Sequence, residues 1–254
     1  MAREGRNKSI GLRIVAIIMI IVIALLGVLL IFIATNSNSN SSSRVSQFIQ
    51  SFVGGRNKKT LAEEAERIIG LNPYEEDIDT TIYTTGTFAT LETAMKEYCI
   101  DYVDTLRSVR TLLKDEQYLN LVTIENIEAD GPSFTKSLGV LDELQTKATE
   151  TIDRLKNMKE ESALMGKIAD IDLNAYFTDL YHEMMVDNIA ARWMYTDAEL
   201  DDALTNLTAS LDSRRSVLEF LRAEKDNWEI TEGKLAFSGE EQLEQYNALT
   251  AALN

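Results

Sequence analysis

His182 is the only histidine of the 254-residue chain, and Glu183 follows it directly. A His-Glu pair begins the zinc-binding helix of many metalloproteases, which needs a second histidine four residues after the first, on the same helical face. Val186 occupies that position here. Because a zinc site at this point would lack nitrogen and sulfur ligands, we expect His182 to be a structural or surface residue, with a ligand or acid–base role as the alternative.

Carboxylates are abundant, but they do not form a complete metal-binding motif. Oxygen ligands alternate over residues 170–174, as they do at the start of a calcium loop, but Ala175 replaces the turn glycine and Tyr181 replaces the bidentate glutamate. A second acidic cluster lies at residues 75–79. Both clusters suit the first turn of a helix, where the helix dipole favours negative charge. The sequence predicts no metal site and no cofactor, and leaves weak divalent-cation binding at these clusters open.

Cys99 is the only cysteine, so the chain cannot form an intrachain disulfide. It lies near Tyr98 and Tyr102 along a helical stripe, where we expect it to belong to the core. The sequence contains no Gly-x-Ser-x-Gly nucleophile motif and no glycine-rich phosphate loop. We therefore predict a protein that is not an enzyme, and keep an enzyme as a minor alternative.

The longest apolar run extends from Ile14 to Ala34 without a charged residue. At about 1.5 Å of helix per residue, this run matches the hydrocarbon thickness of a bilayer. It predicts a transmembrane signal anchor over residues 14–35. A cleaved signal peptide is disfavoured because the run is too long and Phe32 stands where cleavage needs a small residue.

The charges that flank this run predict its orientation. Segment 1–13 contains four basic residues and one acidic residue, whereas the Ser/Asn-rich tether 36–43 contains no charge. The positive-inside rule places segment 1–13 in the cytoplasm and the acidic domain 44–254 outside the cytoplasm. A domain without disulfides favours a bacterial cell surface.

The composition restricts the classes of partner. The chain has 25 Lys+Arg against 41 Asp+Glu, a formal net charge of −16. Nucleic acid is not expected to bind, because phosphate contacts need clustered Lys and Arg. The expected partners are membrane lipid, through the N-terminal helix, and one or more proteins of the cell envelope.

A short amphipathic helix is predicted for residues 44–53, where Gly54-Gly55 should end it. Two interpretations stay open: the helix lies in the membrane interface, or it packs as the first helix of the bundle, which we favour. Its apolar side chains recur at helical spacing and are Val45, Phe48, Ile49, Phe52 and Val53.

Several short patterns predict helix boundaries. Capping-box sequences begin at Thr60 and Thr196, and Asn72-Pro73 combines an N-cap residue with a first-turn proline. Gly70 should end the helix that begins at Thr60. The threonine-rich segment 80–90 is weakly helical, and we expect a loop or a short extended piece there.

Apolar residues three or four positions apart predict the long helices. They recur over residues 88–113, 134–158 and 196–221, and the turn Asp130-Gly131-Pro132 separates the first two of these segments. Arg214 interrupts the stripe of the last one. Stripes of this kind pack against neighbouring helices in an antiparallel bundle.

The period changes near the C-terminus. Residues 228–237 alternate apolar and polar side chains around Gly233, which predicts a small β-hairpin. A last helix should follow over residues 239–253. We therefore predict an all-α fold in which a transmembrane helix precedes an antiparallel helical bundle with this hairpin.

The segment 173–195 is rich in aromatic and methionine side chains, which suit adaptable apolar contacts. Burial in the bundle core is the favoured interpretation, and a partner surface or ligand pocket is the alternative. The residues of this candidate interaction surface are Tyr176, Phe177, Tyr181, Met184, Met185, Trp193 and Met194.

These features lead to one main functional prediction. We expect a membrane-anchored, extracytoplasmic helical bundle that acts as a scaffold, adaptor or accessory subunit of a cell-envelope complex. The alternative is a bundle that senses a ligand or cation. With one predicted span and about 13 cytoplasmic residues, such a bundle would signal through a partner.

Overall fold

The computed structural model describes the backbone of residues 41–112 and 114–253, and the side chains of this part from residue 54 onward. The predicted anchor at residues 14–35 lies outside the described residues, as do segment 1–13 and most of the tether. In the part that is described, no helix is long and apolar enough to cross a membrane. Contacts divide the chain into the units Met1–Lys59 and Thr60–Asn254. Apart from the first part of helix α2, the features below belong to the second unit.

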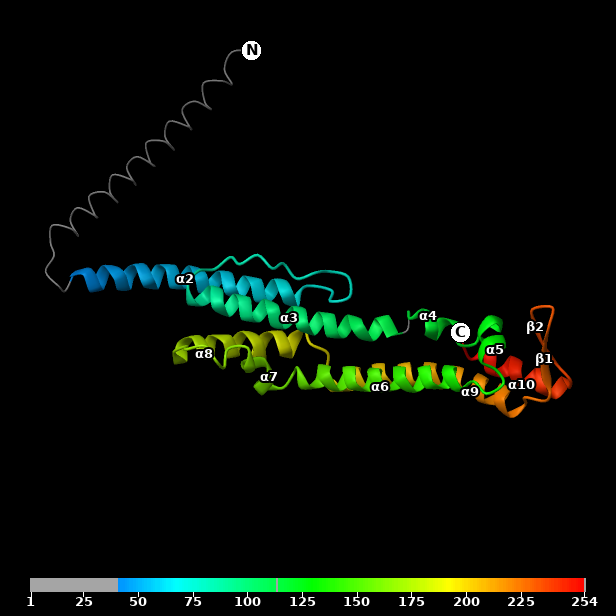
Figure 1. Cartoon of the computed structure of the whole chain (residues 1–254). Coiled ribbons are helices and arrows are strands. Elements are labelled where there is room, and N and C mark those ends of the chain that lie inside the picture. The colour runs from blue at the N-terminus through cyan, green and yellow to red at the C-terminus, as the bar shows by residue number, and fades with distance from the viewer. Residues whose placement is uncertain (1–40, 113, 254) are drawn as a thin grey trace, which may run out of the picture. The chain divides into compact units, whose positions relative to one another are not determined.

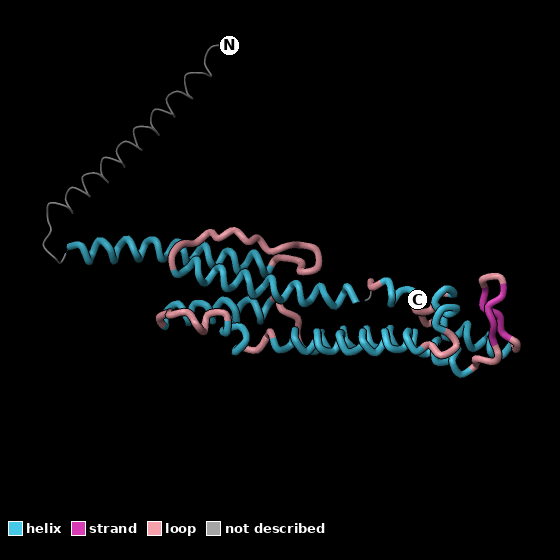
Figure 2. The backbone as a smooth tube through the Cα atoms, viewed as in Figure 1, coloured by secondary structure: helices cyan, strands magenta, loops and turns pink. Residues whose placement is uncertain are grey.

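Helices make up most of the described chain, and a two-stranded antiparallel sheet precedes the last helix (Figure 2). The prediction of a mainly helical fold with a C-terminal hairpin is confirmed. In chain order (Figure 1), the elements are α2 (Ser41–Ile69), α3 (Thr87–Leu112), α4 (Glu116–Asn120), α5 (Ile124–Asp130), α6 (Thr135–Asn157), α7 (Glu161–Gly166), α8 (Ala175–His182), the π-helix η1 (Glu183–Ala190), α9 (Asp197–Ala223), β1 (Trp228–Thr231), β2 (Lys234–Phe237) and α10 (Glu240–Ala251).

Helix α2 corrects two predictions about its own segment. It is continuous through Gly54-Gly55 and through Thr60, so the predicted break and the predicted capping box are both wrong. Two glycines cost a helix about 2 kcal/mol relative to alanines, and the buried contacts of Leu61 and Ile68 in the next turns favour continuing it. The predicted end is confirmed: the Gly70 amide donates to the carbonyls of Glu66 and Arg67, the last turn of α2.

Helix α6 packs against both α3 and α9, so these three long helices form the centre of the second unit. Its predicted stripe is buried as expected at Leu141, Ala148 and Ile152. The turn before α6 is present as well, with Gly131 directly after α5.

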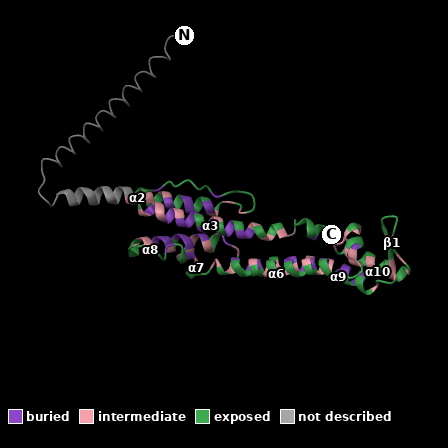
Figure 3. Cartoon of the chain, in the orientation of Figure 1, coloured by how far each residue is buried: buried purple, intermediate pink, exposed green. Residues whose placement is uncertain are grey.

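Buried residues, which are coloured purple in Figure 3, form two hydrophobic clusters in the second unit. The first core joins α2, the N-terminal three quarters of α3, the C-terminal end of α6, and α7, α8 and η1. The second core joins α4, α5, the N-terminal part of α6, the C-terminal half of α9, the hairpin and α10. Leu204 of α9 packs against both clusters.

The hairpin has the predicted glycine turn, and the structure adds its register. Trp228 pairs with Phe237, and Thr231 with Lys234. The two connecting residues, Glu232 and Gly233, have φ of 56° and 71°, which is the left-handed pair of a type I′ turn. The apolar face of the hairpin is half-buried against the second core.

Helix starts match the predictions at one position and differ at two. Thr196 and Glu199 form the predicted capping box of α9. Asn72 does not begin a helix: its side-chain oxygen accepts from the Tyr74 amide at 3.1 Å and closes a single turn. The last helix, predicted to begin at residue 239, begins at Glu240, with Gly239 as its N-cap.

Candidate functional site

His182 lies on the surface at the end of α8 and is partly exposed. Its Nε2 is 3.3 Å from a carboxylate oxygen of Glu161, and its Nδ1 is 3.6 Å from one of Asp187. Across the residues that the structure describes, no group of three or more His, Cys, Asp or Glu side chains could hold a metal ion. His182 is therefore a surface residue that lies beside two carboxylates.

The two acidic clusters have structural partners. Asn174, at the end of the first cluster, caps α8 through the Phe177 amide. In the second cluster, Asp77 pairs with Arg107 at 2.7 Å, and Asp79 accepts from the Tyr83 hydroxyl at 2.6 Å. Hydrogen bonds from Tyr83 and Thr81 lower the pKa of Asp79 below its usual range.

The aromatic and methionine segment is mostly interior. Tyr181, Met184, Met185 and Met194 are buried, and Phe177 and Trp193 are partly buried against the first core. Of the seven residues of the candidate interaction surface, only Tyr176 is exposed, at 51%. The interpretation of this segment as bundle core therefore describes six of the seven residues.

The groups that could act as nucleophiles or acids in this region are also interior. Burial raises the pKa of the Cys99 thiol and of the Tyr181 phenol. The Tyr98 hydroxyl donates to the Met158 carbonyl at 2.6 Å, and burial raises its pKa to about 12. None of these groups ionises near neutral pH.

A groove of about 650 Å³ lies elsewhere, between the turn after α2, the end of α3 and the middle of α9. Its volume is within the range of small-molecule sites. The apolar part of its lining comes from Tyr74, Val109, Ala203 and Leu207, and the polar part from Asn72, Glu75, Arg110, Asn206 and Ser210.

The turn that forms one side of this groove is fixed by side chains from two other elements. Arg107 of α3 donates to the carbonyl of Pro73 at 2.8 Å and to that of Glu76 at 2.6 Å. The indole of Trp193 donates to the Leu71 carbonyl at 3.1 Å. The Tyr74 ring lies 6.3 Å from that of Tyr195. These contacts hold the turn in place without a ligand.

The rest of the loop 70–86 is held by three buried charges, which we call the buried charge network: Glu64 of α2 and Glu92 and Lys96 of α3. The Lys96 ammonium lies 2.9 Å from Glu64 and 2.8 Å from Glu92, and it donates to the Thr81 carbonyl at 2.6 Å. All three of its protons therefore have acceptors.

Glu92 satisfies the backbone of the same loop. Its carboxylate accepts from the Tyr83 amide at 3.0 Å, from the Thr84 amide at 2.9 Å and from the Thr84 hydroxyl at 2.8 Å. Burial alone would raise the pKa of Glu92, but the bonds from Lys96 and these amides outweigh it and the pKa is lowered. Burial would likewise lower the pKa of Lys96, but the two carboxylates raise it.

Sequence reasoning missed this network, although the sequence contains a signal for it. Glu92 and Lys96 are four residues apart, and each is next to a core residue of the α3 stripe, Leu91 and Met95. A Glu–Lys pair at this spacing usually lies on a solvated face. Here the pair lies on the buried side. The irregular loop has no strand partner, so its amides need other acceptors, and the Glu92 carboxylate provides them.

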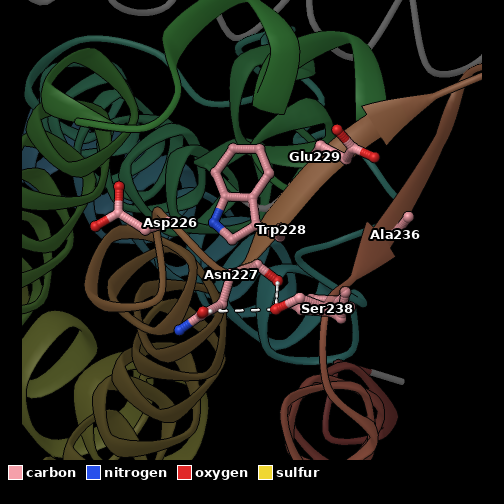
Figure 4. A pocket seen from close by; sticks show the side chains of 7 residues that line it. Asp226, Asn227, Trp228, Glu229, Ala236 and Ser238 are labelled. Atoms are coloured by element: carbon pink, nitrogen blue, oxygen red, sulfur yellow. Dashed lines mark hydrogen bonds between the residues drawn. The ribbon is translucent and has the colours of Figure 1, made fainter.

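A smaller recess of about 230 Å³ lies at the base of the hairpin. Figure 4 shows the indole of Trp228 above Asn227, whose carbonyl and side chain bond to Ser238. The indole nitrogen donates to the Leu221 carbonyl at 2.6 Å. This bond joins the hairpin to the end of α9.

Comparisons of the chain with protein-family models, with curated proteins and with solved structures found no match. The groove and the network that fixes its loop must be interpreted from their own chemistry.

Proposed function

We propose that the chain is a membrane-anchored, extracytoplasmic helical bundle that acts as a scaffold, adaptor or accessory subunit of a cell-envelope complex. The apolar run from Ile14 to Ala34 and its basic flank support the anchor and its orientation.

The observation that carries this proposal is the location of the reactive groups. Lys96 and Glu92 are neutralised inside the fold, and the Cys99 thiol is buried. The bundle thus uses its buried polar groups to fix its own loops, and it offers recognition to other molecules through its surface. We propose that this surface holds a partner or a ligand.

Orientation can be tested by cysteine labelling in intact cells. We expect a membrane-impermeant maleimide to label Ser37→Cys in the tether and to leave the matched variant Ser9→Cys unlabelled until the membrane is opened. Cys99 is buried and should not react with the maleimide in either variant. Labelling of Ser9→Cys alone would contradict the proposed orientation.

The adaptor function is tested by chemical cross-linking of the full chain in intact membranes, followed by purification. A defined complex with a second protein of the envelope is the expected result. Recovery of the uncross-linked monomer, under conditions that cross-link a known membrane complex, would contradict it.

A second candidate function is ligand binding, with the signal passed to a partner. The groove favours it, since its volume suits a small molecule and its loop is fixed in advance. Thermal-shift screening tests this candidate: Ala203→Trp, which fills the groove from an exposed position of α9, should abolish any stabilisation that a ligand gives the parent chain.

A further inference from the structure

We infer that the groove binds a small zwitterion with an apolar body, of the size of a free amino acid or a dipeptide. This inference rests on the second candidate function, ligand binding in the groove. Three observations lead to it: the length of the groove, the charges on its lining and its apolar floor.

The groove is short. On α9 its lining runs from Ala203 to Ser210, which is about 10 Å of helix. At one end, Tyr74 is held against Tyr195. At the other, the Ser210 hydroxyl lies 2.6 Å from that of Tyr118, which brings α4 against α9. Because this length is only about two helical turns, a small molecule fits it better than a helix of a partner protein.

The lining carries one charge of each sign. Arg110 of α3 and Glu75 of the turn both face the groove. Within the described part of the chain, 13 ion pairs join a basic and an acidic side chain. Neither Arg110 nor Glu75 belongs to any of these pairs. A guanidinium suits a carboxylate, and a carboxylate suits an ammonium group.

The third charged candidate, the Tyr74 phenol, stays neutral. Burial, with Tyr195 beside it, raises the pKa of Tyr74 to about 12. At neutral pH the groove therefore presents one guanidinium, one carboxylate and a phenol that can donate or accept a hydrogen bond. A molecule with a single charge would leave one of the two ionic groups without a partner or would face a like charge.

The apolar floor selects the body of the ligand. Leu207 is only 5% exposed, and Val109 is half-buried beside it in the lining. An aliphatic side chain placed here would remove apolar surface from water on both sides. Together, the two charges and this floor fit an ammonium and a carboxylate attached to an aliphatic group.

The test is calorimetric titration of the full chain in detergent with four probes. L-leucine and L-leucyl-L-leucine carry both charges, 4-methylpentanoate lacks the ammonium group, and 3-methylbutylamine lacks the carboxylate. We expect one of the two zwitterions to bind at least tenfold more tightly than either singly charged analogue. Which one does so distinguishes a free amino acid from a peptide as the source of the ligand.

Variants locate the binding site. Arg110→Gln and Glu75→Gln should each weaken zwitterion binding about tenfold or more, because each removes one charge-assisted bond. Arg222→Gln, an exposed change near the end of the same α9 helix, is the matched control and should leave binding unchanged. Circular dichroism of each variant confirms that it is folded.

Two outcomes would overturn the inference. If all four probes bind equally and Ala203→Trp abolishes this binding, the groove binds ligands but does not select a zwitterion. If neither zwitterion binds up to about 10 mM, well beyond a Kd of 1 mM, the inference that the groove binds a zwitterion is also contradicted. The adaptor function would stand in either case, because the cross-linking experiment tests it separately.

Discussion

The first and second cores hold irregular segments in place by different means. Among the side chains that the structure describes, three charged ones are almost fully buried, and these, Glu64, Glu92 and Lys96, adjoin the first core. They fix the loop 70–86, whose amides have no strand partner. Beside the second core, the chain at residues 228–237 forms a two-stranded ladder that satisfies its own amides. The loop needs buried ions because it lacks a ladder.

These two ways of holding a segment affect the stability of the fold differently. Buried ions lose their hydration, so a fully paired network adds little to stability compared with apolar residues, but removing one partner strands the others. The first region should therefore be sensitive to the loss of one charge and to acid. The second should be sensitive to packing. Trp193 belongs to the first core and Trp228 to the second, and they are the only two tryptophans, so single-tryptophan variants can report each region.

The largest expected effect comes from Lys96→Met. It leaves Glu64 and Glu92 buried without a cation, and we expect the free energy of unfolding to fall by about 3–5 kcal/mol. Urea titration followed by Trp193 fluorescence, in a Trp228→Phe background, measures it. Lys147→Met is the control: it removes an exposed pair with Glu143 and should cost at most about 0.5 kcal/mol. Equal losses in the two variants would contradict the role given to the network.

The next effect probes packing in the second region. A Cβ at Gly131 would lie 2.5 Å from the Ile127 carbonyl oxygen and 3.1 Å from the Trp228 indole. Gly131→Ala should cost about 1–3 kcal/mol, measured through Trp228 fluorescence in a Trp193→Phe background. Gly139→Ala, in α6 with nothing within 4 Å of the added Cβ, should instead stabilise by about 0.5–1 kcal/mol. A loss at both positions would show that packing is not the cause.

A smaller effect joins the two regions. Thr196→Ala removes the capping box of α9, a helix that contributes to both cores. We expect a loss of about 1 kcal/mol, with a shift of the urea midpoint at both Trp193 and Trp228. A shift confined to one tryptophan would contradict the contribution of α9 to both cores.

Lowering the pH should also distinguish the two regions, with a smaller effect on stability. The pKa of Glu92 is lowered from 4.5 in the folded state, so its contribution to stability is present above that pH and is lost as the pH falls toward the folded value. Hydrogen bonds lower the pKa of Glu199 in the same way. In the second region, bonds from Ser137 lower that of Asp130 from 3.8, against the effect of burial. We expect Trp193 fluorescence to change at a higher pH than Trp228 fluorescence, and the reverse order would contradict this comparison.

The features that the sequence predicted well depend on local spacing. The buried stripes of α3 and α6, the Thr196 capping box and the turn at Gly233 each follow from residues close together in the chain. The continuity of α2 does not follow from local spacing, because buried contacts of Leu61 and Ile68 outweigh the low helix propensity of two glycines. The groove and the buried charge network unite residues from α2, α3, α9 and the loop. The positions of Glu92 and Lys96 beside core residues are a local signal, but no local pattern shows which distant segments meet them.

The loop 70–86 is a fixed part of the fold, held by Glu92 and Lys96, and it forms one side of the groove before any ligand binds. Hydrogen exchange of the Tyr83 and Thr84 amides in the ligand-free full chain tests this directly. We expect exchange as slow as that of core amides of α3, and much faster exchange in Lys96→Met. Exchange of these two amides at the rate of the exposed turn at Glu232 and Gly233 would contradict it.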